Sequence, residues 1–202
     1  MDYYKILNKN AMKIIDCLKN SEKMYFNEIY EKTCIKSRNN LLKNLNLMVN
    51  LRLLKKEENK SNTFFRINYE NYVSIKLISL SNSMNFYNLP FNRIKIVEEL
   101  IKNLKPTLAV IFGSTAKGNY NKDSDIDILM IYNEKKTELL EEIKNISSRY
   151  GLKVNAIIST FKEIEKKTDA LIHVIKTGYP IVGEEYFYEL KIWLGNLDWR
   201  RK

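Results

Sequence analysis

Cysteine and histidine are scarce in this 202-residue sequence, and their scarcity narrows the chemistry that the chain can carry. Cys17 and Cys34 are the two cysteines, and His173 is the one histidine. Neither cysteine has partners at the spacing of a metal site, so we expect reduced thiols rather than metal ligands or a disulfide framework. His173 lies in the apolar pattern of residues 170–175, which favours packing over catalysis.

Long hydrophobic segments are also missing. No run of about 18 apolar residues occurs, and the N-terminus lacks the basic-then-apolar order of a signal peptide. We therefore expect a cytoplasmic protein with no membrane partner. A hydrophobic content of 45% still allows a buried core, in one domain or in two small ones.

Positive charge is in excess, with a net charge of +10 at pH 7. Residues 1–90 contain 15 Lys and Arg against 8 Asp and Glu, whereas residues 91–202 contain 19 against 16. The basic surplus therefore belongs mainly to the N-terminal part of the chain. Lys and Asn are scattered throughout the sequence, so part of this surplus reflects the general composition of the chain rather than a basic binding surface.

A strand that ends in a tight turn is the first part of the most informative motif. The apolar, β-branched run Leu108–Phe112 stops at Gly113, the residue type that turns a chain without a Cβ penalty. Ser114 follows and can begin a helix whose unpaired N–H groups face an anion, and Lys117 adds positive charge. Gly113, Ser114 and Lys117 are therefore candidate nucleotide-binding residues.

Two acidic residues at the start of the next strand complete the motif. Side chains alternate along a strand, so Asp125 and Asp127 share one face at a spacing of about 6.5–7 Å. Their mutual repulsion is roughly 2–3 kcal/mol, which a cation between them would offset. Carboxylate oxygens beside a phosphate-binding turn suit Mg²⁺. Asp125 and Asp127 are therefore candidate catalytic and metal-binding residues.

The complete pattern is Gly113-Ser114, ten residues, then Asp125-Ile126-Asp127. It resembles the signature of the nucleotidyltransferase superfamily related to DNA polymerase β, and the resemblance covers roughly residues 93–158 in a compact form similar to the minimal prokaryotic members. The resemblance implies that Gly113 and Ser114 hold a nucleoside triphosphate and that the two aspartates bind the divalent ions that assist attack on its α-phosphate. Lys117 stands where the family often has arginine, which keeps the charge but loses the bidentate fork.

One position departs from this resemblance. The family usually places a third carboxylate on a neighbouring strand, and the candidate strand here, Leu152–Ser159, carries Asn155 at that place. An amide can ligate a metal through its oxygen, but it brings no charge and cannot act as a general base. The sequence therefore supports nucleotide binding more directly than catalysis.

The N-terminal part shows three helical periodicities, in residues 12–18, 26–30 and 37–49, followed by a predicted β-hairpin over residues 53–67. This order resembles archaeal and bacterial winged helix-turn-helix regulators, and it implies double-stranded DNA as the partner. The third helix would enter a major groove, and the wing would contact phosphates. The candidate DNA-binding residues are Arg38, Asn39, Lys43 and Asn44 on the helix and Lys55, Lys56, Lys60 and Arg66 on the wing. A domain that mediates only protein contacts is the alternative.

The sequence as a whole predicts an α+β protein. We expect a winged helix-turn-helix domain over residues 1–70, a linker helix over 71–90, and a nucleotidyltransferase α/β domain with a mixed sheet over 91–202. In the linker, apolar residues recur at spacings of four and three, which suits either a homodimer contact or packing against a neighbouring domain. These are Val73, Leu77, Leu80, Met84 and Tyr87. Near the C-terminus, Thr160 and Glu163 form a predicted capping box at the start of a helix through Ile175.

Two functions agree with these observations. The first is a Mg²⁺-dependent nucleotidyltransferase, coupled to DNA binding, that moves AMP from ATP to a hydroxyl of a nucleic acid or of a protein such as a toxin partner. The second is a DNA-binding transcriptional regulator whose nucleotidyltransferase-like domain only binds nucleotide or mediates assembly. Asp125 and Asp127 favour the first function, and Asn155 favours the second.

Overall fold

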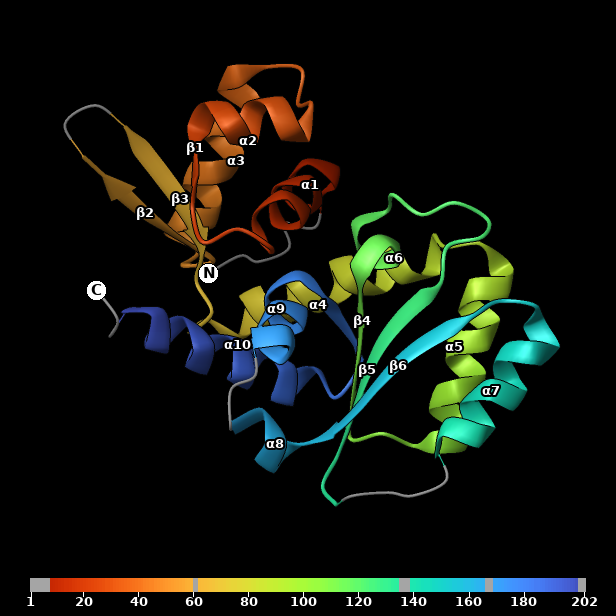
Figure 1. The fold of residues 1–202 in the computed structure, drawn as a ribbon. Helices are drawn as coiled ribbons and strands as arrows, with labels where there is room; N and C mark the ends of the chain where they lie inside the picture. The colour runs from red at the N-terminus through yellow and green to blue at the C-terminus, as the bar shows by residue number, and fades with distance from the viewer. Residues whose placement is uncertain (1–7, 60–61, 135–138, 166–168, 200–202) are drawn as a thin grey trace. The chain divides into compact units, whose positions relative to one another are not determined.

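The computed structural model describes residues 8–59, 62–134, 139–165 and 169–199. The chain divides into two compact units, Met1–Ser81 and Asn82–Lys202 (Figure 1). The boundary falls inside α4 (Tyr72–Tyr87), within the segment predicted as a linker helix. None of the helices in the described part of the chain combines the length and apolar character needed to cross a membrane.

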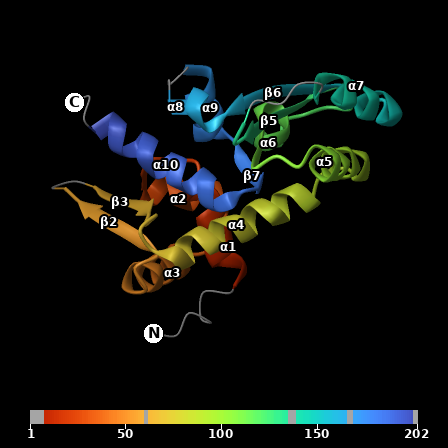
Figure 2. The same cartoon turned by 90° about the horizontal axis from the view of Figure 1, so that it is seen from below.

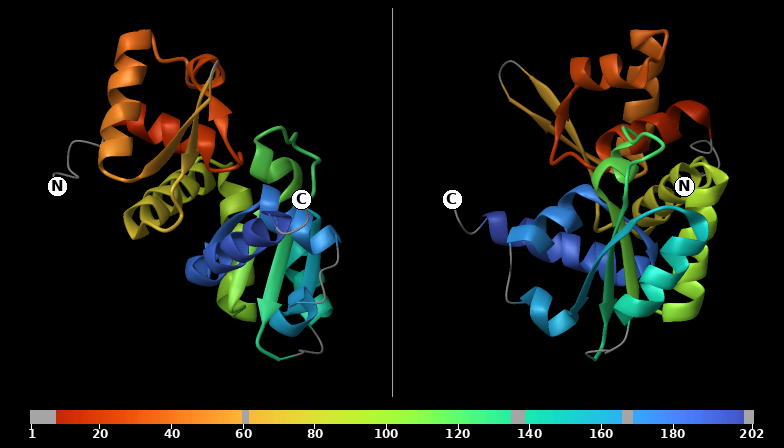
Figure 3. Two further views of the ribbon diagram at one scale, coloured as in Figure 1. Left: turned by 90° about the vertical axis from the view of Figure 1, so that its left-hand side faces the viewer. Right: turned by 45° about the vertical axis from the view of Figure 1, so that its right-hand side comes forward.

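The N-terminal unit contains helices and a small antiparallel sheet in the expected order. Its elements before α4 are α1 (Lys9–Leu18), β1 (Met24–Tyr25), α2 (Phe26–Thr33), α3 (Arg38–Asn50), β2 (Leu54–Glu58) and β3 (Thr63–Ile67). The strand order is β1-β3-β2. Ser37 caps α3 by accepting a hydrogen bond from the Asn40 backbone N–H, as its position before the periodic segment predicts. The hairpin of β2 and β3 extends beyond the three helices of this unit (Figure 3).

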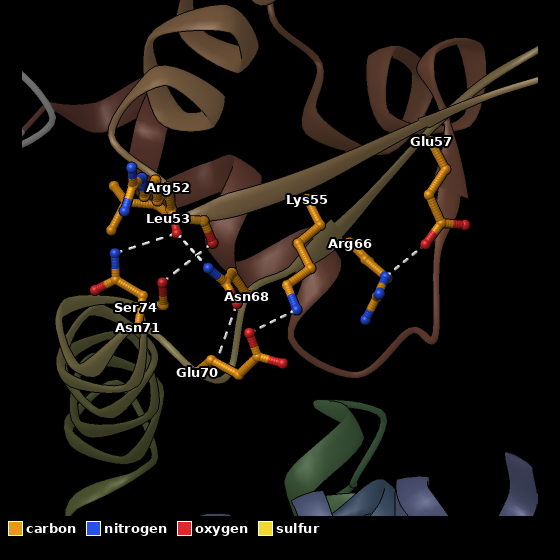
Figure 4. Close-up of polar contacts among 9 residues, drawn as sticks. All are labelled: Arg52, Leu53, Lys55, Glu57, Arg66, Asn68, Glu70, Asn71 and Ser74. Carbon is orange, nitrogen blue, oxygen red and sulfur yellow. Dashed lines mark hydrogen bonds and ion pairs between the residues drawn. The ribbon is translucent and has the colours of Figure 1, made fainter.

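The first half of α4 is attached to the N-terminal unit by polar contacts. Ser74 donates to the Leu53 carbonyl at 3.1 Å, next to the end of α3 (Figure 4). The Lys19 ammonium, almost fully buried, contacts Asp16 at 2.7 Å and the Ser81 hydroxyl at 3.1 Å. These bonds satisfy polar groups that would otherwise be costly to bury.

The apolar repeat along α4 does not pack along its full length within the chain. Leu77 is buried, whereas Leu80, Met84 and Tyr87 are 45%, 51% and 63% exposed. The homodimer contact therefore stays a prediction.

The C-terminal unit is a four-stranded mixed sheet with helices. Its elements after α4 are α5 (Phe91–Leu104), β4 (Leu108–Phe112), α6 (Gly113–Lys117), β5 (Ile126–Tyr132), α7 (Leu139–Tyr150), β6 (Val154–Thr160), α8 (Phe161–Glu165), α9 (Asp169–Thr177), β7 (Tyr179–Val182) and α10 (Glu184–Trp199). The strand order is β6-β5-β4-β7, with β5 and β6 parallel and the other pairs antiparallel. The predicted α+β class with a mixed sheet is confirmed.

Both faces of this sheet are covered. In Figure 2, α5 and α7 lie on one side of the sheet and α9 and α10 lie on the other. Residues Leu108–Ile111 of β4 are fully buried, as expected for a central strand with helices on both faces. Polar residues are confined to the strand ends, and that is where the site lies.

The capping box is confirmed, but the length of its helix is not. Glu163 accepts from the Thr160 backbone N–H at 3.0 Å, and the Thr160 hydroxyl accepts from the Glu163 N–H at 3.4 Å. The helix begun by this cap is described as α8 up to Glu165, and α9 is described from Asp169, where Asp169 supplies an acidic first turn. Residues 166–168 lie outside the described part of the chain, so the prediction of one helix through Ile175 stays a prediction.

Candidate nucleotide and metal site

In the turn between β4 and α6, the backbone of Gly113 lies close to the carboxylate of Asp127. Gly113 has φ +66°, a left-handed conformation that glycine adopts freely. A Cβ at this position would lie 2.1 Å from Asp127 Oδ2, so the turn and the acid fit together only with glycine. Ser114 follows in α6, half-buried, and Lys117 is exposed at the end of the same helix. The three candidate nucleotide-binding residues therefore lie on one short segment beside an acid.

The two aspartates and Asn155 meet at the ends of β5 and β6. Asp127 pairs in register with Asn155 on the parallel neighbour strand, and Asp125 lies just before β5. The Asn155 Nδ2 group donates to Asp125 Oδ2 at 2.9 Å and to Asp127 Oδ1 at 3.1 Å. One amide thus bridges both carboxylates, at the position predicted for it.

A lysine that sequence reasoning missed completes the cluster. The Lys153 ammonium lies 2.9 Å from Asp125 Oδ2. The Lys153 hydrogen bond is the largest effect on the Asp125 carboxyl and, with a weaker contribution from the Asn155 hydrogen bond, it holds the pKa of that carboxyl below its usual value although burial acts in the opposite direction. Lys153 is two residues before Asn155, so the alternation along a strand was the signal that could have indicated it.

A buried arginine holds the loop that carries Asp125. Arg93 is 2% exposed, and its guanidinium donates to the Asn121 carbonyl at 2.9 Å, to the Ser124 carbonyl at 2.7 Å and to the Thr115 hydroxyl at 3.2 Å. The ring of Tyr120 lies 4.6 Å from the guanidinium carbon. Arg93 therefore ties α5, α6 and the loop before β5 together. Its sequence signal was a lone arginine at a core position of an apolar helix.

The donor set at this site fits a divalent cation. Among the described residues no group of three or more His, Cys, Asp and Glu could hold a metal ion, and the acids that could contribute to one at this site are Asp125 and Asp127. The positively charged ammonium of Lys153 lies 2.9 Å from the carboxylate of Asp125. Hard carboxylate oxygens suit Mg²⁺-type ions.

The candidate DNA-binding residues fall into two groups. On α3, Arg38, Asn39 and Lys43 are exposed and Asn44 is half-buried. A groove between α3 and the start of α1 is lined largely by amides and lysines: Asn8, Lys9, Asn10, Asn40, Lys43, Asn44, Asn46, Leu47 and Asn50. The helix α3 itself contains no acidic residue.

On the wing, by contrast, the described cations are paired with acids. Lys55 contacts Glu70 at 2.8 Å and Arg66 contacts Glu57 at 2.7 Å (Figure 4), and Lys56 contacts Glu58 at 2.5 Å. Lys60 lies outside the described residues. The wing therefore presents neutralised pairs where the sequence predicted free positive charge.

Comparison with known proteins assigns the family. The nucleotidyltransferase domain model matches residues 93–180. Two Methanocaldococcus jannaschii proteins, each named "Putative protein adenylyltransferase", are similar to this chain: one is 35% identical over 104 residues, which cover 48% of this chain and 97% of the relative, and the other is 28% identical over 88 residues, covering 41% and 88%.

One solved structure is also similar, that of a toxin–antitoxin with AMP-PNP. The two sequences are 20% identical, the match covers 53% of this chain and 90% of the solved chain, and the TM-score is 0.40. The domain match and the relative whose length is almost fully covered agree with the Gly-Ser turn and the paired aspartates. The chain belongs to the nucleotidyltransferase family.

Proposed function

We propose that this protein is a Mg²⁺-dependent nucleotidyltransferase that moves AMP from ATP to a hydroxyl group of a protein substrate. The observation that carries the proposal is the convergence of Asp125 and Asp127 beside the Gly113 turn, inside the segment matched by the nucleotidyltransferase domain. The names of the two archaeal relatives support adenylyl transfer and a protein acceptor.

In the proposed reaction the acceptor hydroxyl oxygen bonds to the α-phosphorus of ATP. The bond from that phosphorus to the oxygen that bridges to the β-phosphate breaks, and pyrophosphate leaves. Ser114 and the Gly113 turn bind the triphosphate, with Lys117 adding positive charge. Asp125 and Asp127 hold the divalent cation, whose chemistry is to polarise phosphate oxygens. Because Asn155 supplies no carboxylate, the proton of the hydroxyl passes to water.

Label transfer tests this proposal directly. The protein is incubated with Mg²⁺, α-labelled ATP and an extract of its host, and the products are separated into protein, nucleic acid and small molecules. We expect label on a protein band, with none from γ-labelled ATP because the γ-phosphate leaves in pyrophosphate. Label on nucleic acid would keep the enzyme class and change the acceptor, and no label on any species would favour the second function below.

Asn155→Asp is expected to raise the transfer rate by at least about tenfold. The change restores a carboxylate that can accept the hydroxyl proton, a contribution worth about 10²–10⁴ in rate where it operates. Asn145→Asp, an exposed residue of α7, is the matched control and should leave the rate unchanged. If the wild-type protein already transfers AMP rapidly and Asn155→Asp does not raise the rate, no general base is needed at this position.

A second function is DNA binding by the N-terminal unit, which we propose to be a winged helix-turn-helix domain over residues 1–70. The acid-free α3 with its exposed Arg38, Asn39 and Lys43 favours this function. The pairing of the wing cations moves the expected contact away from the wing and onto α3 and the groove beside it. If transfer is absent, this DNA-binding function would stand alone, with the C-terminal unit as a nucleotide-binding or assembly module.

Lys43→Ala is expected to reduce the salt dependence of duplex DNA binding. Loss of one phosphate contact lowers the log–log slope by about 0.9. Lys55→Ala should change the slope by less than about half as much, because its ammonium is already paired with Glu70. Fluorescence anisotropy between about 50 and 200 mM salt measures both slopes. Equal effects would return the wing to the interface, and no binding at about 50 mM would favour a protein-contact domain.

A further inference from the structure

Lys153 holds the position at Asp125 that a metal ion would use. Its ammonium lies 2.9 Å from Asp125 Oδ2, the same oxygen that accepts from the Asn155 amide. Asp125 Oδ2 is therefore already supplied with one cation and one neutral donor by the chain itself. A divalent cation bound to that oxygen would displace the ammonium, because both cations would have to approach the lone pairs of the same carboxylate oxygen.

The ammonium is held loosely enough to be displaced. The Lys153 side chain is 71% exposed and that of Asp125 is 29% exposed, so the pair is partly solvated and screened by salt. Lysine carries its charge on a flexible four-carbon stem, which lets the group swing into solvent without moving β6. Arg93, by contrast, is buried and has its donors in use on carbonyls and a hydroxyl, so it cannot exchange in this way.

We propose that Lys153 is a tethered cation that stays on Asp125, one member of the acid pair, until a divalent ion displaces it, and that it thereby sets the affinity of Asp125 and Asp127 for that ion. The proposal rests on the nucleotidyltransferase function only in taking the acid pair as the metal site. Between turnovers Lys153 offsets one of the two negative charges of the pair, and it keeps the site from holding a cation tightly without nucleotide. It acts on metal affinity, and it is not a catalytic residue.

Binding of Mn²⁺ to the full-length protein without nucleotide tests this inference. Electron paramagnetic resonance of free Mn²⁺ gives the dissociation constant for wild type, Lys153→Met, Lys153→Arg and Lys162→Met. We expect Lys153→Met to bind about three- to fivefold more tightly, the upper part of the range that an exposed ion pair contributes. Lys153→Arg should stay near wild type. Lys162→Met, an equal loss of charge at an exposed position just beyond the far end of β6, should leave the affinity unchanged.

The salt dependence of Mn²⁺ affinity is a second measurement, and a purely structural role of Lys153 would not change it. The difference between wild type and Lys153→Met should shrink as salt rises to about 0.5 M, because the ion pair is screened while the protein fold is retained. Equal Mn²⁺ affinity of wild type and Lys153→Met at low salt overturns the inference, as does equal tightening in Lys162→Met. Lys153→Gln repeats the test if the methionine variant does not fold.

The outcomes separate this inference from the proposed function. If the protein transfers label but Lys153→Met leaves Mn²⁺ affinity unchanged, only the tethered-cation inference fails. If wild type and all variants fail to bind Mn²⁺, the acid pair is not a metal site, and both fail. If Lys153→Met binds Mn²⁺ more tightly but no label is transferred by any variant, the inference stands and the enzymatic function fails.

Discussion

Asp127→Asn is expected to lower the rate of adenylyl transfer by at least about a hundredfold. The substitution removes one of the two charged ligands for the divalent cation, whose contribution to such reactions amounts to several kcal/mol of the activation barrier. Its side chain is isosteric, so the close approach of the Gly113 backbone is preserved. The α-label assay measures the effect, and Asp123→Asn, in the exposed loop before β5, is the control that should retain activity.

Thermal stability gives an independent measurement of the same prediction. A ligand at one hundred times its dissociation constant stabilises the folded state by about 2.7 kcal/mol, so Mg²⁺-ATP should raise the melting temperature of wild type. The Asp125→Asn, Asp127→Asn double variant should lose the metal-dependent part of that rise. Equal shifts for wild type and the double variant would show that the acid pair is not the nucleotide-metal site.

Arg93→Met is expected to lower the free energy of unfolding of the C-terminal unit by about 2–4 kcal/mol. It leaves the Asn121 and Ser124 carbonyls and the Thr115 hydroxyl without their donor, at about 1–3 kcal/mol for each group that stays buried. Arg93→Lys should recover only part of the loss, because one ammonium cannot reproduce the planar fork.

Urea unfolding followed by tryptophan fluorescence measures this loss. Both tryptophans, Trp193 and Trp199, belong to the C-terminal unit, so the signal reports on that unit. Lys95→Met, at a partly exposed position on the same helix with an ion pair to Glu98, is the control and should change the stability by less than about 1 kcal/mol. An Arg93→Met variant as stable as the control would mean that water replaces the guanidinium without loss.

The parts of the fold that could be predicted from sequence are those specified by neighbouring residues. The strand ending at Gly113, the acids at the start of β5 and the Ser37 cap each depend on a few adjacent side chains, and all three are found in the structure. The place of Asn155 was implied by the resemblance to the nucleotidyltransferase superfamily, and the structure brings it to the aspartates through the parallel pairing of β5 and β6.

The partners of individual charges could not be predicted in the same way. Lys153 and Asp125 are 28 residues apart, and Arg93 reaches carbonyls 28 and 31 residues away. Such pairs depend on the register between strands and on how helices pack against the sheet, which periodicity within one element does not specify. The ion pairs of the wing were not predicted for a related reason, because Arg66 and Lys55 contact Glu57 and Glu70, acids outside their own elements, while the DNA contacts of the wing stay a prediction.

The position of β6 in the sheet has a consequence for how the site forms during folding. β6 is an edge strand of this sheet and pairs there with β5, and because the two strands are parallel, the chain between them crosses over through α7. Parallel pairing across a helical crossover is a non-local contact that tends to form late, and sheet edges are among the first backbone segments to open in native-state fluctuations. We therefore expect the contact between Asp127 and Asn155 to open in native-state fluctuations before the Gly113 turn does, because that turn follows the central strand β4.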